Sequence, residues 1–194
     1  PFFTLTTSLF RENPLAWQVF ALLLRALTGV ALWWSAGKIW PKNRRETALL
    51  ALCFVVFPGY LSQWVAFTHS NQELISLLAY LLSFGVTAAA LRRVGRTWPL
   101  TLAGLVLTFV GLFPTEYFIG LELLRPVLLW FMLESAGPVT RKRLAETFKY
   151  WAPYLLLWLA NGIWLYFYRS YGAYDSYDIQ AFSFLQLPPV KLAV

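Results

Sequence analysis

The sequence predicts an all-α, polytopic membrane protein with about six transmembrane helices and one interfacial helix. Of its 194 residues, 59% are hydrophobic and only 13% are charged, whereas soluble domains average roughly 45–50% apolar and about 25% charged residues. The 10 Trp, 10 Tyr and 16 Phe are incompatible with a disordered chain, which has few aromatic residues. Several apolar runs also approach the length of about 20 residues that a membrane-spanning helix needs.

The expected transmembrane helices follow one another through short linkers. In chain order they cover residues 15–40, 47–68, 71–91, 98–113, 117–133 and 151–168. The second run contains Pro58, so this helix either kinks there and continues or ends early in a protein-lined cavity. The fourth run is short because Pro99 and Pro114 bound it.

An additional amphipathic helix is expected over residues 139–150, between the last two transmembrane helices. Leu144 and Phe148 share one face, and Arg141, Lys142 and Arg143 occupy other faces. Such a pattern is typical of a helix that lies in the plane of the membrane interface. We therefore expect an interfacial helix on the cytoplasmic side.

Basic residues gather in alternate linkers, which predicts the orientation in the membrane. The linkers after the first, third and fifth expected helices hold Lys38, Lys42, Arg44, Arg45, Arg92, Arg93, Arg96, Arg141, Lys142, Arg143 and Lys149. Because short basic loops stay cytoplasmic, residues 1 and 194 are expected on the outer side of the cell membrane. Since the chain starts at Pro1 and ends soon after Pro188-Pro189, we expect it to be an internal piece of a longer membrane protein, forming a single domain.

Several function classes are excluded by what the sequence lacks. It has one cysteine, Cys53, and one histidine, His69, which cannot together assemble a zinc or iron–sulfur site. No cofactor is expected, although any requirement for a metal ion stays open. The basic residues lie in three separate linkers, which argues against a nucleic-acid partner.

Three charged residues lie inside expected membrane-spanning helices. Arg25 is ten residues past Leu15, which puts it about 15 Å deep at 1.5 Å per residue. Glu122 and Arg125 are three residues apart and therefore share a helix face. Glu122 and Arg125 either form an internal ion pair or leave Arg125 free to face an outer-leaflet cavity, where it or Arg25 binds a lipid phosphate, for which a guanidinium is well suited.

Polar residues near the outer ends of the helices are further candidates. Ser70 and Glu73 match the S-x-x-E capping box that opens a helix, although Glu73 is also a candidate catalytic carboxylate. His69 is either a loop residue or a phosphate ligand and proton carrier. Glu116 either starts the helix over 117–133, where the helix dipole favours a carboxylate, or serves in catalysis.

The order of several short motifs resembles the GT-C superfamily of membrane glycosyltransferases. Leu9-Phe10 and Asn13-Pro14 precede a leucine-rich helix, as in the "LFGxNPxxxH" segment of that family. Pro58, Trp64-Val65 and Glu73 are similar to an "FxxxPxxxxxVxWxxxRxE" region of its protein O-mannosyltransferase-like branch, and Thr115-Glu116 before Arg125-Pro126 looks like a "KE…LP" element. The chain differs at Arg11, where the family has glycine, and at Gln72, where it has arginine.

This resemblance implies transfer of a sugar from a polyprenyl-phosphate donor to an acceptor on the outer face. It also implies a catalytic Asp or Glu in an outer loop that would precede Pro1, so that His69, Glu73, Glu116 and Arg125 line the pocket at most. Two other classes stay open. A secondary transporter or flippase would use the proline-broken helices and the buried charges as a substrate path, and a non-catalytic membrane subunit would use those charges to hold its helices together.

Overall fold

The computed structural model describes residues 2–10, 13–57, 67–93, 97–134 and 141–171. Within these ranges every regular element is helical, which confirms the predicted all-α class. The elements are α1 (Phe2–Phe10), α2 (Pro14–Ile39), α3 (Arg44–Val56), α4 (Phe67–Arg92), α5 (Trp98–Leu112), the 3₁₀ helix η2 (Ile119–Leu123), α6 (Leu124–Glu134) and α7 (Arg141–Tyr171). The chain divides into two compact units, Pro1–Trp158 and Leu159–Val194.

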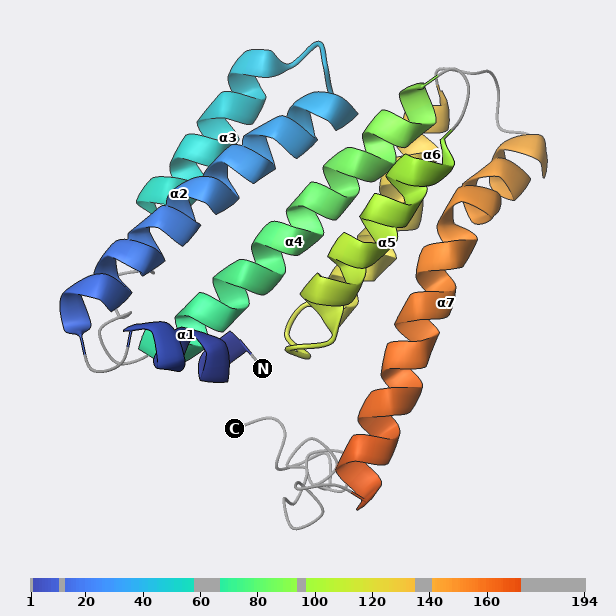
Figure 1. Cartoon of the computed structure of the whole chain (residues 1–194). Helices are drawn as coiled ribbons and strands as arrows, with labels where there is room; N and C mark the ends of the chain where they lie inside the picture. The colour runs from blue at the N-terminus through green and yellow to red at the C-terminus, as the bar shows by residue number, and fades with distance from the viewer. Residues whose placement is uncertain (1, 11–12, 58–66, 94–96, 135–140, 172–194) are drawn as a thin grey trace, which may run out of the picture. The chain divides into compact units, whose positions relative to one another are not determined.

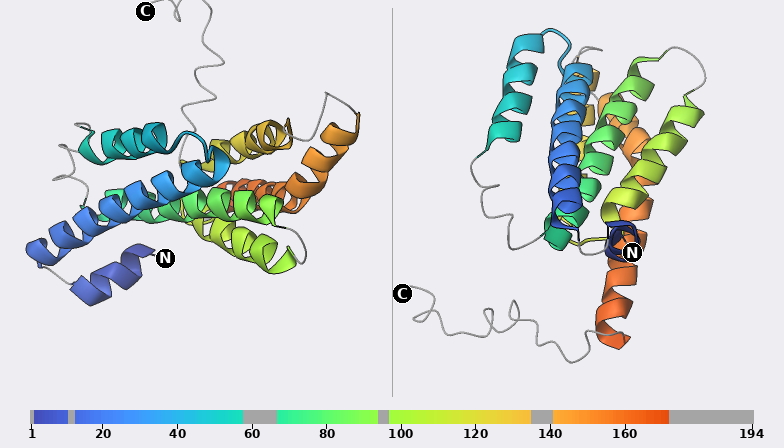
Figure 2. Two further views of the ribbon diagram at one scale, coloured as in Figure 1. Left: turned by 90° about the horizontal axis from the view of Figure 1, so that it is seen from above. Right: turned by 60° about the vertical axis from the view of Figure 1, so that its left-hand side comes forward.

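Helices of the first unit pack side by side in alternating directions (Figure 1). α2 lies between α3 and α4, and α4 lies between α2 and α5, as Figure 2 also shows from a second side. The ends of α2, α4 and α6 therefore lie at the same end of the bundle as the starts of α3, α5 and α7 (top of Figure 1). This end carries the described residues of the basic linkers, and we call it the basic end.

The first expected transmembrane helix is found almost as predicted, as α2. Asn13 occupies the N-cap position and its side-chain oxygen accepts a hydrogen bond from the Ala16 N–H at 3.2 Å. Pro14 follows at the first helical position, where its missing N–H removes no helical hydrogen bond. The Asn-Pro pair is thus explained by helix initiation.

The expectation of a continuous helix over residues 47–68 is wrong. α3 ends at Val56, and Phe57 has extended backbone angles, with φ −56° and ψ 124°. The next residue, Pro58, sterically disfavours a helical conformation at the residue before it. Of the two sequence alternatives the early end holds, and residues 58–66 lie outside the described residues.

The helix expected over residues 117–133 is also divided. Its first part is the 3₁₀ helix η2, and α-helical geometry begins only at Leu124. Pro126 has no N–H to donate to the Glu122 carbonyl, so an α-helix running through both residues would lose a hydrogen bond. Starting α6 at Leu124 puts Pro126 in the first turn, where this donor is not needed.

The interfacial helix expected over residues 139–150 is not a separate element. α7 runs without interruption from Arg141 to Tyr171 and includes Pro153. Leu144 and Phe148 are exposed as the pattern predicted, but Arg143 is buried. The helices expected at 71–91 and 98–113 correspond to α4 and α5, with α4 starting four residues earlier.

Small residues let the central helices approach closely. A Cβ added at Gly104 of α5 would lie against the Tyr154 hydroxyl, and one at Gly111 would lie 2.7 Å from the Tyr80 ring. Tyr80, Phe84 and Leu112 form the buried apolar core at this contact. Close approach through small residues is a common way for apolar helices to associate in membranes.

Two of the described helical segments, Pro14–Ile39 and Glu73–Arg92, are long and apolar enough to cross a membrane. The helix Trp98–Leu112 is apolar but shorter. The lengths of the described helices thus account for two crossings by themselves.

Candidate functional site

Arg125 lies at the centre of a buried polar cluster. It follows η2 in the first turn of α6, and Glu122 lies in η2 three residues earlier. Arg125 Nε donates to Glu122 Oε1 at 2.6 Å and Nη2 donates to Glu122 Oε2 at 3.1 Å, so the pair is bidentate. Both side chains are fully buried, which is the setting in which a charge needs a partner most.

Hydroxyl groups of two other helices complete the hydrogen bonding of Arg125. Nη1 donates to Thr87 Oγ1 at 2.7 Å, and Nη2 donates to Ser83 Oγ at 3.1 Å and to Thr108 Oγ1 at 3.0 Å. Ser83 and Thr108 are joined to each other at 2.7 Å. The guanidinium therefore links α4, α5 and α6 through one set of contacts.

Two aromatic rings flank the same guanidinium. Its carbon lies 4.0 Å from the centroid of the Tyr154 ring and 4.6 Å from that of the Phe84 ring. A desolvated guanidinium over an aromatic face gains about 2 kcal/mol or more. Thr87 Oγ1 lies 3.1 Å from the Tyr154 hydroxyl, as donor to it, so α7 joins the same network. We call Ser83, Phe84, Thr87, Thr108, Glu122, Arg125 and Tyr154 the Arg125 network.

The network satisfies its charges within the protein. The ion pair expected from the spacing of Glu122 and Arg125 is confirmed. Binding of a lipid phosphate by Arg125 or by Glu122 stays a prediction, and it would require the guanidinium to exchange one of these partners for the ligand. The role that this geometry supports directly is a structural one, in which the network joins α4, α5, α6 and α7.

Arg25, the other arginine of an expected transmembrane helix, lies on α2 and is half-buried. Its Nη2 donates to the carbonyl oxygen of Phe57 at 3.4 Å. This carbonyl belongs to the C-cap residue of α3, where a cation is favoured by the helix dipole. Arg25 therefore holds the end of α3 against α2, and a role in phosphate binding stays a prediction.

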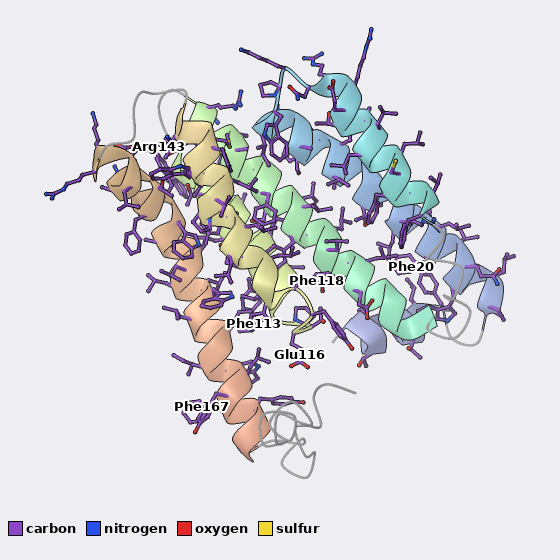
Figure 3. All side chains as sticks on the ribbon, turned by 180° about the vertical axis from the view of Figure 1, so that it is seen from behind. Phe20, Phe113, Glu116, Phe118, Arg143 and Phe167 are labelled. Carbon is purple, nitrogen blue, oxygen red and sulfur yellow. The ribbon has the colours of Figure 1, made fainter. Side chains whose placement is uncertain are left out.

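Glu116 lies in the short loop between α5 and η2 and is exposed. Figure 3 shows it projecting from the end of the bundle opposite Arg143. Thr115 Oγ1 accepts the Tyr117 N–H at 3.2 Å, and the Glu116 carbonyl accepts the Ile119 N–H at 3.2 Å. The expected helix start at Glu116 is wrong, because the 3₁₀ helix begins at Ile119 with Phe118 as its N-cap and no side chain caps it.

The capping box expected at Ser70 and Glu73 is wrong. α4 begins at Phe67, so both residues lie inside the helix. Glu73 is half-buried. His69 belongs to the first turn of α4, and its side chain lies outside the described residues.

Further arginines at the basic end hold helix ends together. Arg92 donates to the carbonyl of Ile39 at 3.1 Å, and Arg143 donates to the carbonyl of Trp130 while its guanidinium lies 4.1 Å from the Trp130 ring centroid. Ile39 is the last residue of α2, where carbonyls lack a helical donor, and Trp130 lies four residues before the end of α6. The sequence placed both arginines in the basic cytoplasmic linkers and did not predict these contacts.

Among the predicted candidates whose side chains the structure describes, it brings Glu122 and Arg125 into direct contact. The residues missed were the hydroxyl partners Ser83, Thr87 and Thr108, together with Tyr154. One available signal was the i, i+4 spacing of Ser83 and Thr87 within an otherwise apolar helix. Hydroxyl groups on one face of such a helix indicate a polar partner on a neighbouring helix.

The fold and the network define an all-α helical bundle with a buried ion pair. No protein-family model, curated protein or solved structure matches this chain.

Proposed function

We propose that this chain is a multi-pass membrane part of a GT-C-like glycosyltransferase, which moves a sugar from a polyprenyl-phosphate donor to an acceptor on the outer face. The order of motifs in the sequence suggests the family. The exposed carboxylate of Glu116, at the end of the bundle opposite the basic linkers, is the observation that carries the proposal.

Large exposed apolar side chains support the membrane location. On α2 alone, Leu22, Leu23, Leu27 and Val30 are each more than half exposed. Similar residues lie on the other helices, including Leu49, Leu52, Leu102, Val106, Phe131, Leu156 and Ile163. Soluble monomers rarely expose contiguous apolar patches beyond a few hundred Å², and lipid is the solvent that suits this surface.

We propose six crossings, made by α2, α3, α4, α5, the η2–α6 pair and α7. α3 and α5 have 13 and 15 residues, which at 1.5 Å per residue is about 20 Å. They are shorter than the hydrocarbon core of about 30 Å. Such short helices are tolerated where their ends are buried in protein or line a water-filled cavity.

The basic end of the bundle determines the orientation in the membrane that we propose. Lys42, Arg44, Arg93, Arg141 and Lys142 are exposed there. Because basic loops stay on the cytoplasmic side, the opposite end with Glu116 faces outward. On that face, donor and acceptor meet beside Glu116, with Glu73, His69 and Arg25 as further pocket residues.

The test uses the full-length parent protein, reconstituted in liposomes and supplied with a panel of polyprenyl-phosphate sugars. Wild type transfers the sugar, and Glu116→Gln lowers kcat/KM at least tenfold because a group beside the reacting atoms is lost. Glu46→Gln is the matched control, since Glu46 is exposed in the first turn of α3 at the basic end. Equal activities of the two variants would remove Glu116 from the site, and no transfer with any donor would contradict the enzyme proposal.

A second candidate function is a non-catalytic membrane subunit. The observation that favours it is the Arg125 network, in which the buried charges are paired within the protein and join α4, α5, α6 and α7. Absence of sugar transfer by a correctly folded parent protein supports this candidate. Movement of the labelled donor lipid between leaflets without its consumption would instead indicate a transporter.

A further inference from the structure

A cavity of about 120 Å³ lies near the basic end, between α4, α5 and α7. It is lined by Thr87, Ala90, Thr101, Lys149, Tyr150, Pro153 and Tyr154. A single water molecule needs only about 10–15 Å³ of such a volume. The cavity therefore has room for several waters or for one compact polar group in their place.

The lining offers several hydrogen-bond donors that point to an anion. Lys149 contributes an ammonium group with three donors, and Tyr150 and Tyr154 contribute hydroxyl groups, whereas the Thr101 hydroxyl already donates to the Thr97 carbonyl. Tyr154 is almost fully buried and its oxygen already accepts from Thr87, so its own proton is directed elsewhere. The ion pair that the described residues contain joins Arg125 to Glu122, so the ammonium group of Lys149 can be offered to a ligand.

The position of the cavity indicates which anion it meets. Thr101 lies in the first turn of α5, Ala90 lies in the last turn of α4, and Lys149 lies two turns into α7. All three are close to the basic linkers, at the level where lipid headgroups meet a membrane protein. Lys149 is exposed, so the rim of the cavity reaches the surface.

We propose that this cavity binds the headgroup phosphate of an anionic phospholipid in the leaflet that faces the basic linkers. The Lys149 ammonium and the hydroxyl of Tyr150 hold the phosphate oxygens at the rim, and the Tyr154 hydroxyl contacts the deepest oxygen. Because Thr87 contacts both Tyr154 and Arg125, the bound lipid also stabilises the Arg125 network from one side. The site lies away from Glu116 and is distinct from the proposed sugar-transfer site.

This inference rests on the proposed membrane location but not on sugar transfer, so the experiment contains no sugar donor. The detergent-purified full-length protein is titrated with dihexanoyl phosphatidylglycerol, and native mass spectrometry counts bound lipids. Wild type binds one lipid saturably. Lys149→Gln lowers its affinity about tenfold, since a charge-assisted hydrogen bond to phosphate is lost.

Two further variants keep the test specific. Tyr150→Phe lowers the affinity several-fold without changing charge, whereas Lys142→Gln, which removes the same charge from an exposed residue outside the cavity lining, changes it less than twofold. Equal losses in Lys142→Gln and Lys149→Gln would overturn the proposal, because they would indicate general charge attraction. If inorganic phosphate binds in a Lys149-dependent way and the lipid does not bind, the proposal that the phosphate belongs to a phospholipid would be overturned.

Discussion

Arg25 and Arg125 both lie in apolar helices, yet the protein surrounds them differently. Arg125 is fully buried and bonded to Glu122 and to hydroxyl groups of two other helices. Arg25 is half-buried, and its Nη2 donates to the Phe57 carbonyl at the longer distance of 3.4 Å. A carboxylate three residues away distinguishes the first arginine from the second.

The two arginines show two ways in which a charge in an apolar helix is accommodated. A charge at the centre of a bilayer costs at least about 2.5–3.5 kcal/mol on insertion scales, so it needs protein partners or an aqueous cavity. Arg125 has protein partners throughout and joins helices, whereas Arg25 joins the end of α3 to α2 and keeps part of its surface exposed. Of the two, Arg25 is therefore better placed to meet a ligand.

The largest effect is expected from breaking the Glu122–Arg125 pair. Glu122→Gln or Arg125→Gln leaves a buried charge or its polar partners uncompensated, which lowers the free energy of unfolding by about 3–5 kcal/mol. The double variant is expected to lose less than the two single losses added together. Chemical unfolding of the detergent-purified full-length protein measures all three, and strictly additive losses would contradict the coupling.

A smaller effect is expected from disturbing the packing around the network. Gly104→Ala places a methyl group against the Tyr154 hydroxyl, and such overpacking costs about 1–3 kcal/mol. Gly37→Ala is the matched control, because a Cβ there meets nothing within 4 Å and alanine favours a helix interior by up to about 1 kcal/mol. The same unfolding assay compares the two, and equal effects would show that the α5–α7 contact is not close.

The smallest effect is expected from Arg25→Gln. The long hydrogen bond to the Phe57 carbonyl contributes about 1 kcal/mol or less, and removing the charge lowers the cost of placing α2 in a membrane. Unfolding of this variant is compared with that of Arg125→Gln. A loss from Arg25→Gln as large as that from Arg125→Gln would erase the distinction between the two arginines.

The sequence predicted the parts of this fold that depend on local pattern. The length of the apolar runs located α2 and α4, and the i, i+3 spacing of Glu122 and Arg125 predicted their ion pair. The partners Thr87 and Tyr154 were not predicted, because they come from helices that are distant in sequence and are brought to Arg125 by packing. Local pattern left two alternatives at Pro58, of which the early end of the helix is confirmed, and it did not address Pro153, which lies inside a continuous helix.

The candidate site was predicted less completely than the fold. Glu116 was recognised from its place at the start of a helical run, but the exposure of its side chain depends on how α5 and η2 meet. The sequence placed Arg143 on a charged face of the expected interfacial helix. Its burial against Trp130 depends on the direction in which α7 leaves α6, which no local pattern contains.

The proposed site depends on the claim that the two ends of the bundle lie on opposite sides of a membrane. Cysteine labelling tests this claim most directly. In a full-length background with Cys53→Ala, single cysteines are introduced as Asn43→Cys, between α2 and α3 at the basic end, and as Glu116→Cys; both positions are exposed. In intact cells an impermeant thiol reagent is expected to label position 116, and to label position 43 only after the membrane is opened. Labelling of position 43 in intact cells would contradict the orientation and would move Glu116 to the wrong face for sugar transfer.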